Sequence, residues 1–183
     1  MSAPERSPER DAAIEAMLPH VAATGWTIRT LMDAAGPDAD LLFSGGATDM
    51  IEAYIDWADR RMEQEAVRRD VSMLRLSERV RAVIAIRFEQ NRPYKDAIRR
   101  AFGLLSTPGN ALLAARATAR TVDTIWHAAG DSSADFSWYT KRAILAAIYG
   151  ATLLYWLRDN SDADENTMAF LDRRLAGIAQ FSR

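Results

Sequence analysis

One run of fifteen residues restricts the possible folds of this chain more than any other feature. From Ala143 to Leu157 there is no charged side chain, while Lys141, Arg142 and Arg158 stand at its two ends. A helix that crosses a bilayer needs ~20 apolar residues, so the run is too short to span a membrane. A helix that is apolar almost all round is enclosed by its neighbours. We therefore expect a buried helix.

Apolar residues at three- and four-residue spacing continue through the rest of the chain. They predict helices over residues 9–23, 27–35 and 48–68, then from 76 to 91 and from 93 to 105, with a weak segment at 38–43. A further stripe predicts a long helix ended by Gly130, with Leu112, Ala115, Ala119, Val122 and Trp126 on one face. The run from Ala143 and one last helix complete an all-α fold of about eight to ten helices. No segment alternates with the period of a strand.

Composition excludes several classes of protein. The net charge of -2 provides no general attraction to nucleic acid or acidic lipid, and the absence of Cys excludes disulfides and thiolate chemistry. The N-terminus has no apolar segment typical of a secretion signal, which favours a cytoplasmic protein.

The first fifty residues resemble the start of a TetR-type regulator, with helix-turn-helix spacing around Gly25 and Gly36. DNA binding requires cations on the recognition segment. Between Thr30 and Asp59 there is no Lys or Arg, but there are seven acids: Asp33, Asp38, Asp40, Asp49, Glu52, Asp56 and Asp59. We expect a degenerate helix-turn-helix in residues 1–50, followed by a second helical part in residues 51–183, both within one continuous folded unit. A ligand-responsive TetR-type regulator remains the alternative.

Signals of catalysis are absent from the sequence. His20 and His127 are the only histidines, and no metal-ligand motif, phosphate-binding loop or nucleophile elbow occurs. His127 fits a structural role at its helix end better than that of a catalytic base. We expect no enzymatic activity, no cofactor and no metal site.

Aromatic residues next to an acidic turn mark a surface that binds a partner. Trp126, Trp138 and Tyr139 flank the turn that contains Asp135. Large aromatic side chains provide contact area at low entropic cost. The uncharged run that follows forms either a plain core or the lining of an apolar cavity. The last helix either docks on the core or lies in a membrane interface.

Several motifs in the second half of the chain resemble the ubiquinone-biosynthesis accessory proteins known as the coenzyme Q protein nine family. The segments that carry the resemblance are Trp126 to Asp131, Asp135 to Arg142 and Ala146 to Tyr149. Further support lies in residues 92–95, 104–110 and 170–174.

The resemblance implies a TetR-like fold without DNA binding, a homodimer, and a hydrophobic pocket for a lipid or isoprenoid quinone intermediate. A protein of this kind presents the quinone to the di-iron demethoxyubiquinone hydroxylase. The partner patch would comprise Asp135, Trp138, Tyr139 and Arg142. The pocket would involve Ile144, Leu145, Ile148, Tyr149, Leu153 and Trp156. The C-terminal helix would meet the membrane through Met168, Phe170, Leu171, Leu175, Ile178 and Phe181. A bacterial member, peripheral to the inner membrane, fits best.

Overall fold

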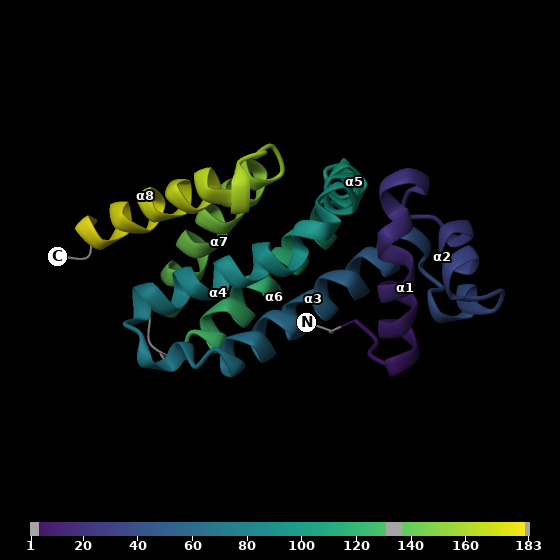
Figure 1. The fold of residues 1–183 in the computed structure, drawn as a ribbon, viewed down its shortest axis with the longest axis horizontal. Coiled ribbons are helices and arrows are strands. Elements are labelled where there is room, and N and C mark those ends of the chain that lie inside the picture. Colours follow the sequence, from purple (N-terminus) through teal and green to yellow (C-terminus); the bar gives the residue numbers. More distant parts are fainter. Residues whose placement is uncertain (1–3, 131–136, 182–183) are drawn as a thin grey trace. The chain divides into compact units, whose positions relative to one another are not determined.

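The computed structural model describes residues 4–130 and 137–181, with the side chains of 4–130 and 139–177. Over these residues it contains eight α-helices, five short 3-10 turns and no strand (Figure 1). The helices are α1 (Pro8–Thr24), α2 (Ile28–Ala35), α3 (Gly46–Arg68), α4 (Leu76–Asn91), α5 (Lys95–Leu105), α6 (Ala111–Ala128), α7 (Ser137–Trp156) and α8 (Glu165–Phe181). The predicted all-α fold is confirmed.

The chain forms two compact units. Residues 1–58 and 91–117 make the first unit, and residues 59–90 and 118–183 make the second. The proposed functional boundary at residue 50 stays a prediction, because this division concerns packing alone.

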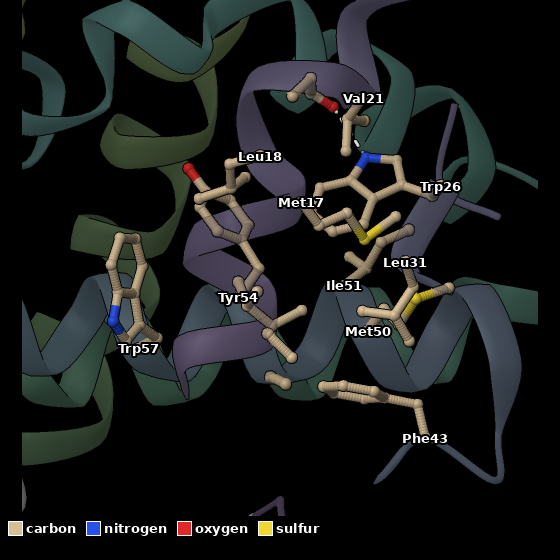
Figure 2. Packing of buried hydrophobic residues seen from close by; sticks show 14 of the residues in the cluster. Met17, Leu18, Val21, Trp26, Leu31, Phe43, Met50, Ile51, Tyr54 and Trp57 are labelled. Carbon is tan, nitrogen blue, oxygen red and sulfur yellow. Dashed lines mark hydrogen bonds between the residues drawn. The ribbon is translucent and has the colours of Figure 1, made fainter. Parts of the chain in front are cut away.

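The core of the first unit lies between α1, α2, the first half of α3 and α5 (Figure 2). Met17, Met50 and Leu31 have no exposed surface. The indole Nε1 of Trp26 donates a hydrogen bond of 2.9 Å to the carbonyl oxygen of Ala97, which ties the turn after α1 to α5. Gly25 ends α1 with a φ of 83°, a conformation that favours glycine.

The start of α1 is held to α3 by two arginines. Arg10 is 4% exposed, its guanidinium lies 2.5 Å from the carboxylate of Asp49, and it stacks 4.2 Å from the ring centre of Phe43. Arg6 pairs with Asp56 at 2.6 Å. Both acids belong to the segment that the sequence analysis expected to present a negative field.

The second unit contains the second half of α3, most of α4 and α6, and helices α7 and α8. Its helix α8 begins at a capping network, where Asp159 accepts hydrogen bonds of 2.9 Å from the Thr167 backbone and 2.6 Å from the Thr167 hydroxyl. The Ser161 amide donates a third, also of 2.9 Å. These bonds satisfy donors that a helix start otherwise leaves without partners.

Helix α6 departs from the predicted stripe. Leu112, Ala115 and Ala119 are exposed, whereas the buried face contains Ala117, Val122, Ile125 and Ala129. The stripe was therefore wrong for its first half. Its 3,4 spacing fits a helix, but sequence spacing does not specify which side of the helix has neighbours.

Candidate functional site

Helix α7 is sided. Leu145, Ile148, Tyr149 and Trp156 are buried, and Leu153 is partly buried. Ile144, Leu154 and Tyr155 are 37%, 47% and 38% exposed. The uncharged run thus forms the expected helix, and one of its faces is buried. The opposite face is apolar but exposed to solvent. A helix that only fills a core would not require an exposed apolar face.

The inner face of α7 packs against a phenylalanine of α4. The ring of Phe88 stacks on Tyr149, with 6.1 Å between centroids and 12° between planes. It also lies 5.1 Å from the ring of Trp156. Aromatic contacts of this geometry stabilise a core beyond the area they bury. They place two predicted pocket residues, Tyr149 and Trp156, around one side chain of another helix.

A charged group lies within the same unit near Tyr149. Burial raises the pKa of the Tyr149 hydroxyl, and the nearby Arg87 only partly opposes this effect. Arg87 is itself paired with Asp59, and both are buried. The sequence contains no signal for this pair, because its members are 28 positions apart on two helices.

The predicted partner patch is described in part. Tyr139 is 75% exposed at the start of α7. The Arg142 guanidinium lies 2.6 Å from the carboxylate of Asp123 on α6, and its side chain is 17% exposed. Asp135 and the side chain of Trp138 lie outside the described residues. Assignment of these four residues to a partner stays a prediction.

The C-terminal helix α8 packs against α7. Leu171 is fully buried, and Met168, Phe170 and Leu175 are partly buried. Phe170 stacks on Tyr155 at 4.7 Å, and the Arg174 guanidinium lies 4.8 Å from the Phe170 ring centre. The side chains of Ile178 and Phe181 lie outside the described part of the helix. Docking therefore holds for the described start of α8, while its contact with a membrane stays a prediction.

A surface hollow of about 760 Å3 lies where α7 ends and α8 begins. Its apolar side includes Leu154, Tyr155 and Phe170, and its polar end includes Arg158 and Asn166. The six predicted pocket residues do not line it. Apolar spacing does not indicate this hollow, because polar residues after the end of α7, from Arg158 to Ser161, form part of its lining. The next segment is η5 (Asp162–Asp164).

His127 has a partner that the sequence analysis did not anticipate. Its Nε2 lies 3.3 Å from the carboxylate of Glu63 on α3, and its side chain is 80% exposed. The prediction that His127 holds its helix end and the following turn together stays a prediction, because residues 131–136 lie outside the described residues. Among the described residues, no three acidic or histidine side chains come together as metal ligands.

The degenerate helix-turn-helix has a short third element. The segment after α2 is η1 (Ala39–Leu42), a single 3-10 turn with the exposed acid Asp40. Asp33 and Asp38 are exposed as well. The acids that remain on this surface oppose contact with phosphates.

Comparison with known proteins finds a similarity to one family. Residues 111–182 match the COQ9 family model. The chain is 31% identical over 174 residues to the ubiquinone biosynthesis protein COQ9, mitochondrial, of Homo sapiens, covering 88% of this chain and 55% of that protein. The resemblance to COQ9 is confirmed. A COQ9 protein of Drosophila melanogaster is 39% identical over 51% of this chain and 29% of its own length. This chain thus spans about half the length of the two vertebrate COQ9 proteins that match most of it.

The TetR-like fold of this COQ9-related chain is also confirmed. A crystal structure of a TetR transcriptional regulator from Nitrosomonas europaea superposes with a TM-score of 0.76, at 26% identity, over 95% of this chain and 99% of the other. In the part of the chain that the structure describes, no helix is long and apolar enough to cross a bilayer.

Proposed function

We propose that this chain is a lipid-binding accessory protein of ubiquinone biosynthesis, which presents an isoprenoid quinone intermediate to the di-iron demethoxyubiquinone hydroxylase. The observation that carries the proposal is the coincidence of the COQ9 match with α7 and α8. Within this region the apolar helix α7 begins beside an exposed aromatic residue, Tyr139. The chemistry belongs to the hydroxylase, and the role of this chain is to shield and deliver the substrate.

The lipid would lie against α7. An isoprenoid tail in water is costly, at ~25 cal/mol per Å2 of apolar surface, and a protein pocket removes that cost. The proposed lining comprises Ile144, Leu145, Ile148, Tyr149, Leu153 and Trp156. Ile144 is 37% exposed, so it would lie at the mouth.

Solvent extraction and mass spectrometry of the purified chain test the pocket directly. An isoprenoid quinone or lipid is expected to co-purify with the wild type. Ile144→Asp should lower its yield, whereas Leu41→Asp, a change at a 79% exposed residue of the first unit, should not. The lipid proposal fails if no lipid is found with the wild type.

The hydroxylase would bind at the start of α7. Exposed aromatic residues commonly dominate the free energy of an interface, so Tyr139→Ala should weaken binding about tenfold or more. Trp138→Ala should do the same, and Asp135 and Arg142 would complete the patch. Leu41→Ala is the control for the loss of an exposed apolar side chain. Unchanged affinity in both aromatic variants would remove this surface from the proposal.

A homodimer would use the open apolar face of α7, which includes Leu154 and Tyr155. Leu154→Arg should convert the dimer to a monomer in sedimentation equilibrium. Helix α8, with Met168, Phe170, Leu171, Leu175, Ile178 and Phe181 on or beside its apolar side, would rest on the inner membrane of a bacterium from the cytoplasm. Leu171 would contribute there by anchoring α8 to its own unit.

A ligand-responsive transcriptional regulator is the second candidate, and the TetR-like neighbour favours it. The stretch from Thr30 to Asp59 without Lys or Arg opposes it. Electrophoretic retardation of the promoter DNA at low salt distinguishes the two functions. We expect no retardation, and a specific shift would favour the regulator.

A further inference from the structure

The turn between α5 and α6 exposes apolar side chains that the core does not use. Phe102 and Leu104 near the end of α5 are each 39% exposed, and Leu112 at the start of α6 is 63% exposed. We name these three residues the apolar turn. All three belong to the first unit, and η4 (Pro108–Asn110) joins their helices. Neighbouring exposed apolar residues mark a surface that contacts something other than water.

Three polar side chains of this turn bond within it. The Ser106 hydroxyl donates to the carbonyl of Phe102 at 2.7 Å, and the Thr107 hydroxyl donates to the carbonyl of Leu104 at 2.9 Å. The Asn110 side chain donates to the same Leu104 carbonyl, also at 2.9 Å. These bonds fix the path of the chain between α5 and α6, so the exposed apolar side chains lie on an ordered turn.

Basic side chains predominate around the apolar turn, although Asp96 pairs with Arg99. Over residues 97–122 there are four arginines and no acid. Arg116 is exposed and lies one helical turn after Leu112, on the same side of α6. Arg100 is exposed too, with its Nε hydrogen-bonded to the carbonyl of Ala22 at 2.9 Å. Apolar insertion and cationic attraction to anionic headgroups add to one another at a membrane surface.

We propose that the apolar turn contacts the surface of an anionic lipid bilayer, with Leu112 inserted and Arg116 at the headgroups. This contact is separate from the one proposed for α8, and it does not require that the chain carry a quinone. An exposed leucine with an exposed arginine one helical turn away matches the two attractions that add at an anionic bilayer. An acidic protein would attract the arginine but would not make binding depend on anionic lipid, so the vesicle experiments distinguish the two.

A second exposed apolar site provides a matched control. Met73 lies in η2 (Val71–Met73) and is 81% exposed, which exceeds the value for Leu112. The exposed acid Asp70 precedes this turn, and the exposed Glu78 lies at the start of α4, which follows it. If exposure alone governed bilayer contact, Met73 would insert at least as well as Leu112.

The absence of cysteine allows each site to be labelled alone. Leu112→Cys and Met73→Cys chains would each carry an environment-sensitive fluorophore and be mixed with phosphatidylcholine vesicles, with or without phosphatidylglycerol. We expect a blue shift for the label at 112 only with phosphatidylglycerol, and none at 73. The proposal is overturned if the label at 112 stays in water while the protein sediments with the vesicles. Equal shifts at both sites, or a shift without anionic lipid, would overturn it as well.

Vesicle partitioning of unlabelled variants provides the second measurement. Leu112→Ser should weaken binding to anionic vesicles about tenfold, because the serine no longer buries a leucine side chain. Arg116→Glu should weaken it about tenfold or more, since it replaces a cation by an anion at the headgroups. Arg29→Glu changes the net charge equally at a side chain that is 90% exposed, and it should have a small effect. Thermal unfolding checks that each variant folds. The proposal is contradicted if Leu112→Ser and Arg116→Glu both bind anionic vesicles as strongly as the wild type does.

Discussion

The guanidinium of Arg87 lies 3.0 Å from the carboxylate of Asp59, and both side chains are buried in the second unit. The Thr121 hydroxyl donates a hydrogen bond of 3.0 Å to the other oxygen of Asp59. Helices α3, α4 and α6 thus meet at one polar site inside an apolar unit. A buried charge of this kind is tolerated only while its partner is present.

Replacement of Asp59 by Ala should destabilise the protein by about 3–5 kcal/mol, because Arg87 would keep a buried charge without its carboxylate. Urea unfolding followed by circular dichroism measures the loss. Asp33→Ala removes an acid that is 70% exposed and lies 3.7 Å from Arg29, so it serves as the control. Its effect should stay within about 1 kcal/mol. Similar losses in the two variants would contradict a special role for the buried pair.

Gly130 should not tolerate a side chain. Its φ is +74°, and a Cβ there would lie 2.8 Å from Nη1 of Arg79. Gly130→Ala should cost about 1–2 kcal/mol from the backbone alone, and more if Arg79 has to move. Gly177 lies within α8 with no atom within 4 Å of such a Cβ, so Gly177→Ala should stabilise by about 0.5–1 kcal/mol. Opposite signs in thermal unfolding would confirm the contrast.

The free energy of unfolding should depend on pH through the carboxyl group of Asp159. Burial tends to raise the pKa of its carboxyl, but hydrogen bonds from Thr167 and Ser161 outweigh burial and lower the pKa from 3.8 to about 2. A carboxylate with a lowered folded pKa stabilises the protein above its unfolded pKa, and that contribution is lost as the pH falls toward the folded value. The free energy of unfolding should therefore fall between pH 3.8 and about 2.

The size of this contribution is on the order of 2 kcal/mol. Asp159→Asn should lack that part of the pH dependence while Asp162→Asn, at an exposed acid of the same turn, keeps it. Urea titrations across the acid range measure both. An unchanged pH profile in Asp159→Asn would show that another carboxylate is responsible.

Trp26 should be sensitive to the loss of its indole N–H. Trp26→Phe preserves an aromatic ring but leaves the Ala97 carbonyl without this buried donor, which should cost about 1–3 kcal/mol. Trp126→Phe tests the effect of ring size, because the indole nitrogen of Trp126 is buried and bonds to no group among the described residues. If ring size alone mattered, the two losses would be equal.

The sequence predicted the helices well because their signals are local. Apolar spacing, together with glycines such as Gly25 and Gly130 and prolines such as Pro93, placed the ends of most helices within a few residues. The uncharged run located α7 for the same reason. The resemblance on residues 126–149 then indicated the family before any contact was known.

The remaining features depend on contacts between distant residues. Asp49, Asp56 and Asp59 were expected to form part of an acidic field, yet the structure pairs them with Arg10, Arg6 and Arg87. Their partners lie 39, 50 and 28 positions away, beyond the range of any helical spacing rule. The exposure of the first half of the α6 stripe was not predicted either. Periodicity shows which residues share a face of a helix, but not whether another helix covers that face.

The aromatic stacking on Phe88 has a consequence for any attempt to dissect the chain. The region that matches COQ9 begins at residue 111, whereas the ring between Tyr149 and Trp156 comes from α4. A fragment restricted to the matched region would lack that ring and the arginine beside it. The region that matches the family model is therefore not an independent structural unit. Experiments on fragments of the chain should preserve α4 together with α7.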